Sequence, residues 1–213
     1  MKRIAKTANA IILLLAMALF LAGCDSGAVA PVYEAATPGD AADAELPEIP
    51  LAKGGETVDV GSFTVTVPEG WLGAGDLDMD DEGNYIIGTN YYLLIKGGES
   101  ADEQFEKPTV SIYYTAEYSA QQLLDLNISP EDENTLFDLT VGGKTCPAYH
   151  ALKDYSDEEI GPFVMEYDNV FIPVTDGSCL RLTMLTYITN QGETGIGASD
   201  ADVVAIMESL KVN

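Results

Sequence analysis

The chain has 213 residues, with 35 acidic side chains against 10 lysines and arginines, and its net charge at pH 7 is −25. So few cations argue against nucleic-acid binding, which needs a basic face to neutralise phosphates. The length excludes a large multidomain enzyme, and an apolar content of 46% argues against disorder throughout. We therefore expect one acidic globular domain.

Residues 1–23 are typical of an export signal. Three cations, Lys2, Arg3 and Lys6, precede an apolar run over 10–22, and no acid lies in this stretch. The run is shorter than the roughly 20 residues that a membrane-spanning helix needs. A positive start, a short apolar middle and a small-residue end predict a secretory signal peptide.

The signal ends in Leu21-Ala22-Gly23-Cys24, which resembles the lipobox of bacterial lipoproteins. The resemblance implies that Cys24 is diacylated and becomes the first residue of the mature chain. It places the protein on the extracytoplasmic face of the cell membrane, held there by lipid. An ordinary cleaved signal with a chance cysteine is the alternative.

Residues 24–54 are interpreted as a flexible, acidic tether rich in proline and alanine, with four of the ten prolines of the chain. Such a stretch buries too little apolar surface to offset its ordering cost. The negative charge of the chain would repel anionic headgroups, so the tethered domain stands off the membrane. The globular domain is expected at 55–213.

Alternating apolar residues predict strands over much of the region 55–213. The strands are expected at 57–60, 63–67, 85–95, 108–115, 136–141, 145–152, 163–174 and 179–188. A short helix is expected over 119–127, where Ser119 and Gln122 have the spacing of a capping box. A glycine-rich loop at 190–198 leads to a final helix that ends near Leu210. This order predicts an α+β fold on a mostly antiparallel sheet.

The order of these elements resembles PsbP-like domains. The resemblance is carried by Phe63 to Trp71, where a strand is followed by Pro-x-Gly-Trp, and by the closing segment Ile206 to Lys211. It implies a mostly antiparallel β-sheet flanked by helices, a PsbP-like α/β/α sandwich, over about 60–212. It also implies an accessory or binding role, because it brings no catalytic motif.

His150 is the single histidine of the chain. A hydrolytic triad needs a histidine with a nucleophile and an orienting acid, and no sequence motif supplies this arrangement. We therefore expect no catalytic residue, and a histidine that packs on a strand or is exposed. An envelope hydrolase built around His150 is kept as a less favoured alternative.

Cys146 and Cys179 remain once Cys24 is assigned to the lipid. An even number of cysteines in an exported domain allows a disulfide between them. The alternative is two buried thiols. The sequence leaves both open, and in either case the role is structural.

An acidic stretch at 76–84 alternates carboxylates before a glycine, as calcium loops do. The candidate ligands are Asp76, Asp78, Asp80 and Glu82. The EF-hand pattern fails, because counting from Asp78 puts Thr89 where a bidentate glutamate is required. A less regular calcium site is an alternative to an ordinary solvated acidic loop.

These observations predict a lipid-anchored, extracytoplasmic binding or accessory module without catalysis. No cofactor is expected, with calcium as the alternative. The expected partners are the membrane, through the lipid on Cys24, and a protein of the envelope. We expect the domain to be monomeric. The second hypothesis is an ion- or solute-binding lipoprotein that uses the acidic loop 76–84.

Overall fold

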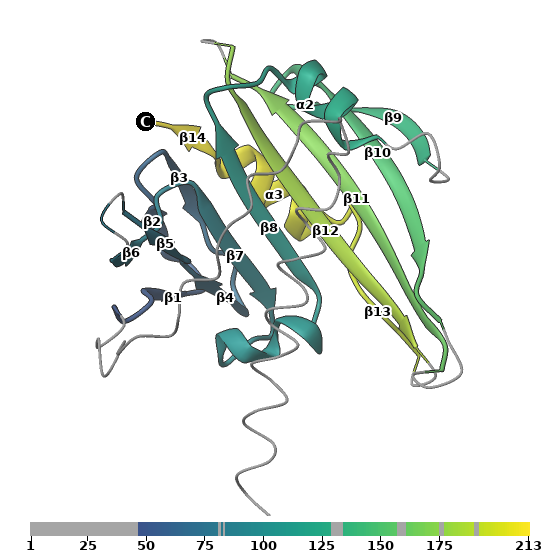
Figure 1. Ribbon diagram of the computed structural model, residues 1–213, viewed down its shortest axis with the longest axis horizontal. Coiled ribbons are helices and arrows are strands. Elements are labelled where there is room, and N and C mark those ends of the chain that lie inside the picture. The colour runs from purple at the N-terminus through teal and green to yellow at the C-terminus, as the bar shows by residue number, and fades with distance from the viewer. Residues whose placement is uncertain are drawn as a thin grey trace, which may run out of the picture. The chain divides into compact units, whose positions relative to one another are not determined.

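Antiparallel strand pairing organises the chain (Figure 1). The computed structural model describes residues 47–80, 82, 84–128, 134–156, 161–174, 177–189 and 192–213. Within these ranges the main sheet has nine strands, in the order β1-β4-β7-β8-β12-β11-β10-β9, with β13 pairing on β12. The strands are β1 (Leu51–Lys53), β4 (Trp71–Ala74), β7 (Tyr91–Lys96), β8 (Thr109–Thr115), β9 (Asn134–Val141), β10 (Lys144–Asp154), β11 (Phe163–Pro173), β12 (Cys179–Thr189) and β13 (Gly192–Thr194).

Two small sheets and three helices accompany the main sheet in the described residues. One small sheet has the order β14-β3-β2 and the other pairs β5 with β6. Their strands are β2 (Thr57–Asp59), β3 (Phe63–Thr66), β5 (Leu77–Met79), β6 (Tyr85–Ile87) and β14 (Lys211–Val212). The helices are the 3-10 helix η1 (Ala101–Phe105) and the α-helices α2 (Ala120–Asn127) and α3 (Ala201–Ser209). None of them is long and apolar enough to cross a membrane.

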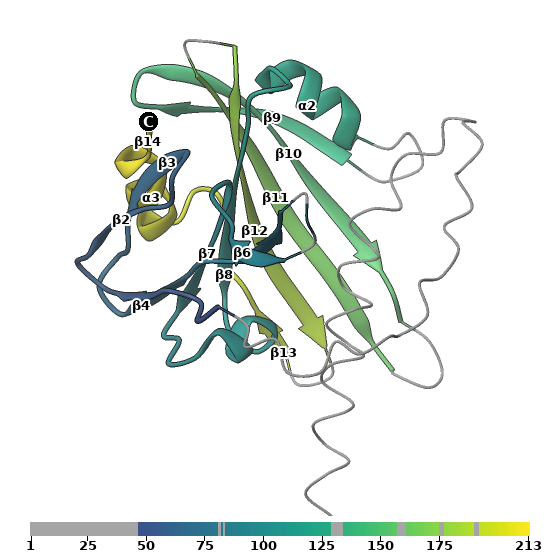
Figure 2. The same ribbon diagram turned by 60° about the vertical axis from the view of Figure 1, so that its left-hand side comes forward.

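The helices α2 and α3 pack against opposite faces of the main sheet, as Figures 1 and 2 show. Successive side chains of a strand point to opposite faces, so each long strand contributes to two hydrophobic clusters. Ala148 of β10 belongs to the cluster of α3, and its neighbour Tyr149 belongs to the cluster of α2. The sheet thus has an α3 face and an α2 face.

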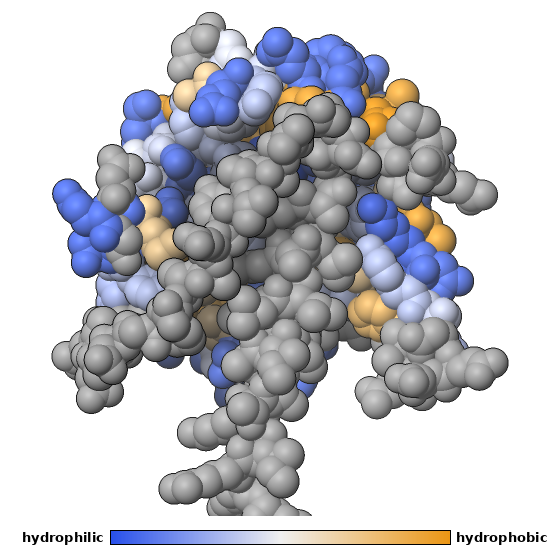
Figure 3. Space-filling model, viewed as in Figure 1, coloured by the Kyte–Doolittle hydropathy of each residue, from blue (hydrophilic) through white to orange (hydrophobic). Residues whose placement is uncertain are grey.

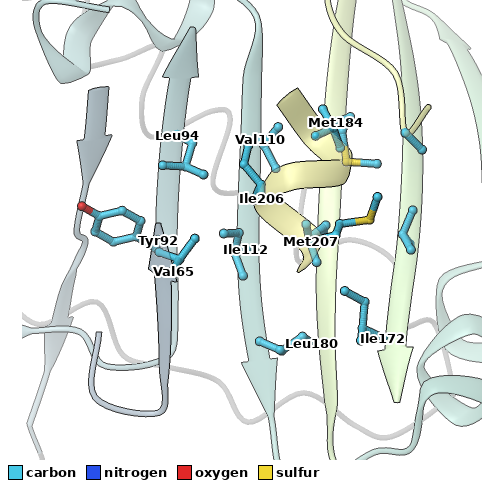
Figure 4. Packing of buried hydrophobic residues seen from close by; sticks show 14 of the residues in the cluster. Val65, Tyr92, Leu94, Val110, Ile112, Ile172, Leu180, Met184, Ile206 and Met207 are labelled. Carbon is cyan, nitrogen blue, oxygen red and sulfur yellow. The ribbon is translucent and has the colours of Figure 1, made fainter. Parts of the chain in front are cut away.

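The larger core lies on the α3 face. Ile206 and Met207 of α3 are buried there with strand residues such as Val110 and Ile112 (Figure 4). Strand β3 closes the same core with Val65. A fully buried side chain of this size contributes about 1.5–3 kcal/mol, so this packing holds α3 on the sheet although the helix has only nine residues.

The predicted fold class is wrong. The chain is mostly antiparallel sheet, and not an α+β, PsbP-like α/β/α sandwich flanked by helices. The helices α2 and α3 have eight and nine residues, so each covers only part of one face of a nine-stranded sheet. Helical periodicity marked these two segments correctly, but periodicity does not say how much of a sheet a helix covers.

The predicted start of the globular domain is too late. Residues 51–53, which we placed in the tether, form β1 and pair with β4. The compact unit that contains them begins at Leu46. Leu51 and Lys53 are exposed while Ala52 is buried, so this strand has a weak apolar signature. The pairing partner, and not the composition, makes it a strand.

Cys146 and Cys179 form no disulfide and are two buried free thiols. Cys146 lies on β10 in the α3-face cluster, and Cys179 lies on β12 in the α2-face cluster. Strand β11 runs between β10 and β12. Two strands with one strand between them lie about 9.5 Å apart. A disulfide needs Cα atoms within roughly 7 Å of each other. Of the two alternatives, a disulfide or two buried thiols, the structure shows two buried thiols.

Candidate functional site

A polar hollow lies on the α3 face, where the chain passes from β13 to α3. Its volume is about 280 Å³. The long strands β10, β11 and β12 supply its floor, and the segment that precedes α3 supplies one wall. The residues that line it are His150, Glu166, Tyr167, Asp168, Met184, Thr186, Gly195, Ile196, Gly197 and Asp200. We call it the His150 hollow.

His150 and Asp168 form a cross-strand pair in this hollow. They lie opposite each other in the β10–β11 register, and the imidazole Nδ1 is 2.9 Å from Asp168 Oδ1. An ionised carboxylate only accepts, so Nδ1–H donates and Nε2 is left to accept from, or donate to, a visiting group. The His150 side chain is 41% exposed, so solvent reaches it.

The second oxygen of Asp168 ties the pair to the wall of the hollow. Asp168 Oδ2 accepts a hydrogen bond from the backbone N–H of Ala198 at 2.8 Å. Asp200 holds the same segment, because its Oδ2 accepts from the backbone N–H of Gly197 at 2.7 Å. These two carboxylates therefore order the 195–200 segment and at the same time face the hollow.

The wall of the hollow approaches the floor closely at one glycine. A Cβ on Gly195 would lie 1.8 Å from Oγ1 of Thr186 and 2.4 Å from its Cα. No side chain fits there, so glycine is required for the segment to lie against β12. The shape of the hollow depends on this contact.

Charge is the main chemical property of the His150 hollow. Three carboxylates line it, those of Glu166, Asp168 and Asp200, and neither lysine nor arginine does. At about 280 Å³ it is at the small end of ligand pockets and fits a group of a few heavy atoms. A positively charged group is the natural occupant.

The described part of the chain supplies no nucleophile to His150. The imidazole bonds to Asp168 there and to no serine, threonine or cysteine. Those same residues contain no group of three or more His, Cys, Asp or Glu side chains placed to hold a metal ion. The arrangement has a base with its orienting acid, and a negative cavity beside them.

The predicted calcium ligands lie elsewhere, on the β5–β6 hairpin. Asp76 and Asp78 accept hydrogen bonds from the backbone N–H groups of Leu77 and Met79. Burial, the larger cause, and the neighbouring Asp78 raise the pKa of Asp76. These carboxylates hold the backbone next to them, and the calcium site remains a prediction.

Asp80 organises the turn of the same hairpin. Its Oδ1 accepts from the backbone N–H groups of Glu82 at 3.0 Å and Asn84 at 2.8 Å. This is the usual role of an aspartate that begins a turn. Cys24, the predicted lipid attachment site, lies outside the described residues.

The sequence contained an overlooked signal for the hollow. Glu166 and Asp168 occupy alternate positions of β11 on the same side as the core residues Val170 and Ile172. Acids at core-facing positions of a long strand are unusual, because an unpaired buried charge is costly. They indicate either a paired acid or a cavity, and here both are present.

Comparison with known proteins adds little. No protein-family model matches the sequence, so the resemblance to PsbP-like domains is without support. No curated protein matches it either. Among solved structures it is similar to LpqN, which is involved in cell envelope biogenesis of Mycobacterium tuberculosis. The sequence identity is 14%, over 78% of this chain and 92% of that chain, and the TM-score is 0.34. We base no argument on a similarity of this size.

Proposed function

We propose that the chain is a lipid-anchored, extracytoplasmic binding module without catalytic activity, whose His150 hollow receives a positively charged group of its partner. The anchor and the location rest on the lipobox resemblance at 21–24. The observation that carries the binding role is the gathering of three carboxylates around one small cavity.

Both the charges that line the hollow and the net charge of the whole chain favour a cationic partner group. Nearby, Glu166, Asp168 and Asp200 face the hollow with no lysine or arginine among its lining residues. Farther away, the net charge of −25 produces a field that attracts cations and speeds their encounter. The size of the hollow suits the ammonium end of a lysine side chain of an envelope protein.

The non-catalytic part of the proposal rests on the composition of the site. Nucleophilic catalysis needs a hydroxyl or thiol within hydrogen-bond distance of the base. Among the described residues, the hydrogen bond of His150 goes to Asp168 alone. The pair then orients the imidazole for hydrogen bonding to a bound group.

In-cell crosslinking followed by affinity capture tests this function. Four versions of the chain are compared: the native chain, Cys24→Ala, Glu166→Gln and Asp138→Asn. Glu166→Gln removes one charge from the hollow, and Asp138→Asn removes one from an exposed position of β9 as the matched control. We expect Cys24→Ala to lose the partner, because it removes the lipid.

Glu166→Gln should reduce capture about fivefold, because a partly exposed charge contact is worth about 1 kcal/mol. Asp138→Asn should capture as much as the native chain. Equal capture by Glu166→Gln would remove the hollow from the interface. A purified chain that turns over a substrate and loses that activity in His150→Ala would be an enzyme, contrary to the proposal.

A further inference from the structure

The α2 face of the main sheet carries the guanidinium of Arg181, and no acidic side chain among the described residues pairs with it. In the part of the chain that the structure describes, ion pairs join Lys96 to Asp202 and Lys107 to Glu103, and none involves Arg181. This is unexpected in a chain with 35 acids and 10 lysines and arginines.

Two neutral neighbours hold the guanidinium in place. Its Nη1 donates a hydrogen bond to Asn127 Oδ1 at 3.1 Å, at the C-terminal end of α2. Its Cζ lies 5.5 Å from the centroid of the Tyr113 ring. Asn127 in turn donates from Nδ2 to the carbonyl of Leu123 in α2. The side chain is thereby fixed in position.

One edge of the guanidinium, that of Nε, meets no hydrogen-bond acceptor in the described part of the chain. Arg181 Nε is closed off from solvent, and no hydrogen-bond acceptor of the described residues reaches it. A buried donor without an acceptor is costly, and a native structure rarely keeps one without a reason. Because Nη1 donates to Asn127, the edge formed by Nε and Nη2 is the one available to bind a ligand. That edge presents two parallel N–H groups, which match a carboxylate or a phosphate.

The strand neighbours of Arg181 on this face carry neutral hydrogen-bonding groups. Thr183 Oγ1 donates to Asn169 Oδ1 at 2.7 Å, and Thr183 lies opposite Ser111 in the β12–β8 register. Tyr91 hydrogen-bonds to Ser111. Tyr113, over the guanidinium, is 38% exposed. The rest of a solute whose anionic group binds Arg181 would contact tyrosine rings and hydroxyl groups there.

We propose that Arg181 is the anchor of an oxyanion-binding site on the α2 face, which takes a small solute bearing a carboxylate or phosphate group. The anion accepts two hydrogen bonds from the Nε–Nη2 edge. Because Nε has no solvent contact in this structure, binding shifts the Tyr113 ring that lies over the guanidinium. The net charge of −25 opposes both sources of the anion, but a small solute is favoured over a lipid headgroup, because an anionic membrane carries many charges and is repelled more strongly than a single anion.

This site is independent of the His150 hollow. Arg181 and Cys179 lie at alternate positions of β12, on the face of the α2 cluster, whereas Met184 lines the hollow from the other face. Phosphate or acetate has no attraction to a hollow lined by three carboxylates. Failure of one proposal therefore leaves the other standing.

Nitrogen-15 NMR of the uncleaved 213-residue chain, in which residues 1–23 are retained, tests the site directly. The chain has two arginines, Arg3 and Arg181, so its Nε–Hε region contains two arginine signals. Sodium phosphate and sodium acetate are titrated against sodium chloride at constant ionic strength. We expect a saturable shift of the Arg181 signal with phosphate or acetate, and none with chloride or at Arg3.

Two variants test whether the guanidinium itself binds the anion, and lipid vesicles test whether the anion belongs to a lipid headgroup. Arg181→Lys keeps the charge but cannot offer two parallel N–H groups, so it should weaken phosphate binding about tenfold, followed through the Tyr113 signals. Lys53→Gln, at an exposed position of β1, is the control and should bind as the native chain does. Vesicles of phosphatidylcholine with and without phosphatidylglycerol are the lipid arm.

The outcomes are distinct. A saturable shift with free phosphate or acetate supports the solute site, and a shift only with phosphatidylglycerol vesicles assigns the oxyanion to a lipid headgroup and overturns the solute proposal. An Arg181 signal that responds equally to chloride, phosphate and acetate overturns the site. The titration of the native chain decides this even if Arg181→Lys does not fold.

Discussion

At the residue scale, the His150 hollow depends on a missing side chain. Gly195 leaves no room for a Cβ, which would lie 1.8 Å from Thr186 Oγ1. Gly195→Ala should lower the free energy of unfolding by about 2 kcal/mol, the usual cost of forcing an extra methyl into a packed contact. Gly75→Ala is the matched control, because its Cβ would meet neighbours at 3.5 Å or more. Urea denaturation measures both, and equal midpoints would contradict the close contact.

Buried phenols and a buried thiol make stability fall in alkali. Burial raises the pKa of Cys179 from 9.0 to about 12 and those of Tyr91, Tyr92 and Tyr187 from 10.0 to about 12. Between pH 9 and 12 the unfolded chain ionises these groups first and so binds fewer protons. The free energy of unfolding therefore falls as pH rises through this range, and below it these groups add no slope. A flat profile of urea midpoints from pH 9 to 12 would contradict the burial of these groups.

Replacing Tyr92 with phenylalanine is predicted to stabilise the protein. Its hydroxyl is buried and has no hydrogen-bond partner among the described residues. Tyr92→Phe removes that unpaired group, so the free energy of unfolding at neutral pH should rise by about 1 kcal/mol. Its alkaline decline should also be shallower. Tyr118→Phe, at a 39% exposed position, should change neither quantity. A loss of stability in Tyr92→Phe would show that the hydroxyl has a partner.

At the scale of elements, α2 begins where its first residues require. Ser119 Oγ accepts from the backbone N–H of Gln122, and Gln122 Oε1 accepts from the backbone N–H of Ser119. Leu123 and Leu124 then pack on the α2 face. This local chemistry is visible in the sequence, which is why the helix was predicted over nearly its true range.

The capping hydrogen bond of Ser119 should contribute measurably to the stability of the protein. Ser119→Ala removes the acceptor for Gln122 N–H and should lower the free energy of unfolding by about 1 kcal/mol. Gln121→Ala is the control, because it removes a surface hydrogen bond to Asp125 worth a few tenths of a kcal/mol. Amide hydrogen exchange should speed up in α2 for the first variant and not for the second. Equal exchange in both would mean that packing alone sets the start of α2.

The shortest strands could not be predicted from neighbouring residues. β1 and β13 have three residues each, and we expected them in a tether and in a loop. The predicted strand 85–95 is broken at 88–90 and forms β6 and β7 in two different sheets. β1 forms because it pairs with β4, which follows only after β2 and β3, so no short stretch of sequence contains both strands. β13 instead pairs with the end of β12 just before it, and its three residues are too few to show a strand pattern.

At the scale of the whole molecule, acidic charge opposes the compact state. The net charge is −25, and hydrophilic side chains occupy much of the rim of the surface in Figure 3. Raising NaCl from 0.01 to 0.1 M shortens the Debye length from about 30 to about 10 Å. We therefore expect the urea midpoint to rise with salt. A fall would mean that ion pairs dominate over repulsion.

Two controls accompany the salt experiment. Choline chloride should raise the midpoint as much as sodium chloride, because screening depends on ionic strength alone. Calcium chloride at the same ionic strength examines the acidic loop 76–84. An additional rise with calcium that is lost in Asp78→Asn would support the calcium alternative, and an equal rise would count against it.

The candidate site was only partly predictable. His150 could be singled out because it is the one histidine, and the acids at 166 and 168 could be read as unusual strand positions. Their meeting with Asp200 depends on the β10–β11 register and on where the segment after β13 returns to the sheet. A shift of one residue in that register would turn these side chains to the other face.

The sequence by itself determined what depends on neighbouring residues: the signal pattern, the acidic charge, the strand-rich character, and the cap of α2. The tertiary structure decided what depends on pairing and coverage. It separated Cys146 from Cys179 on opposite faces, limited the helices to parts of the sheet, and brought three carboxylates to one hollow. The physical reason is range, since caps and charges act over a few residues of chain whereas register and burial are set by segments that meet only in the folded molecule.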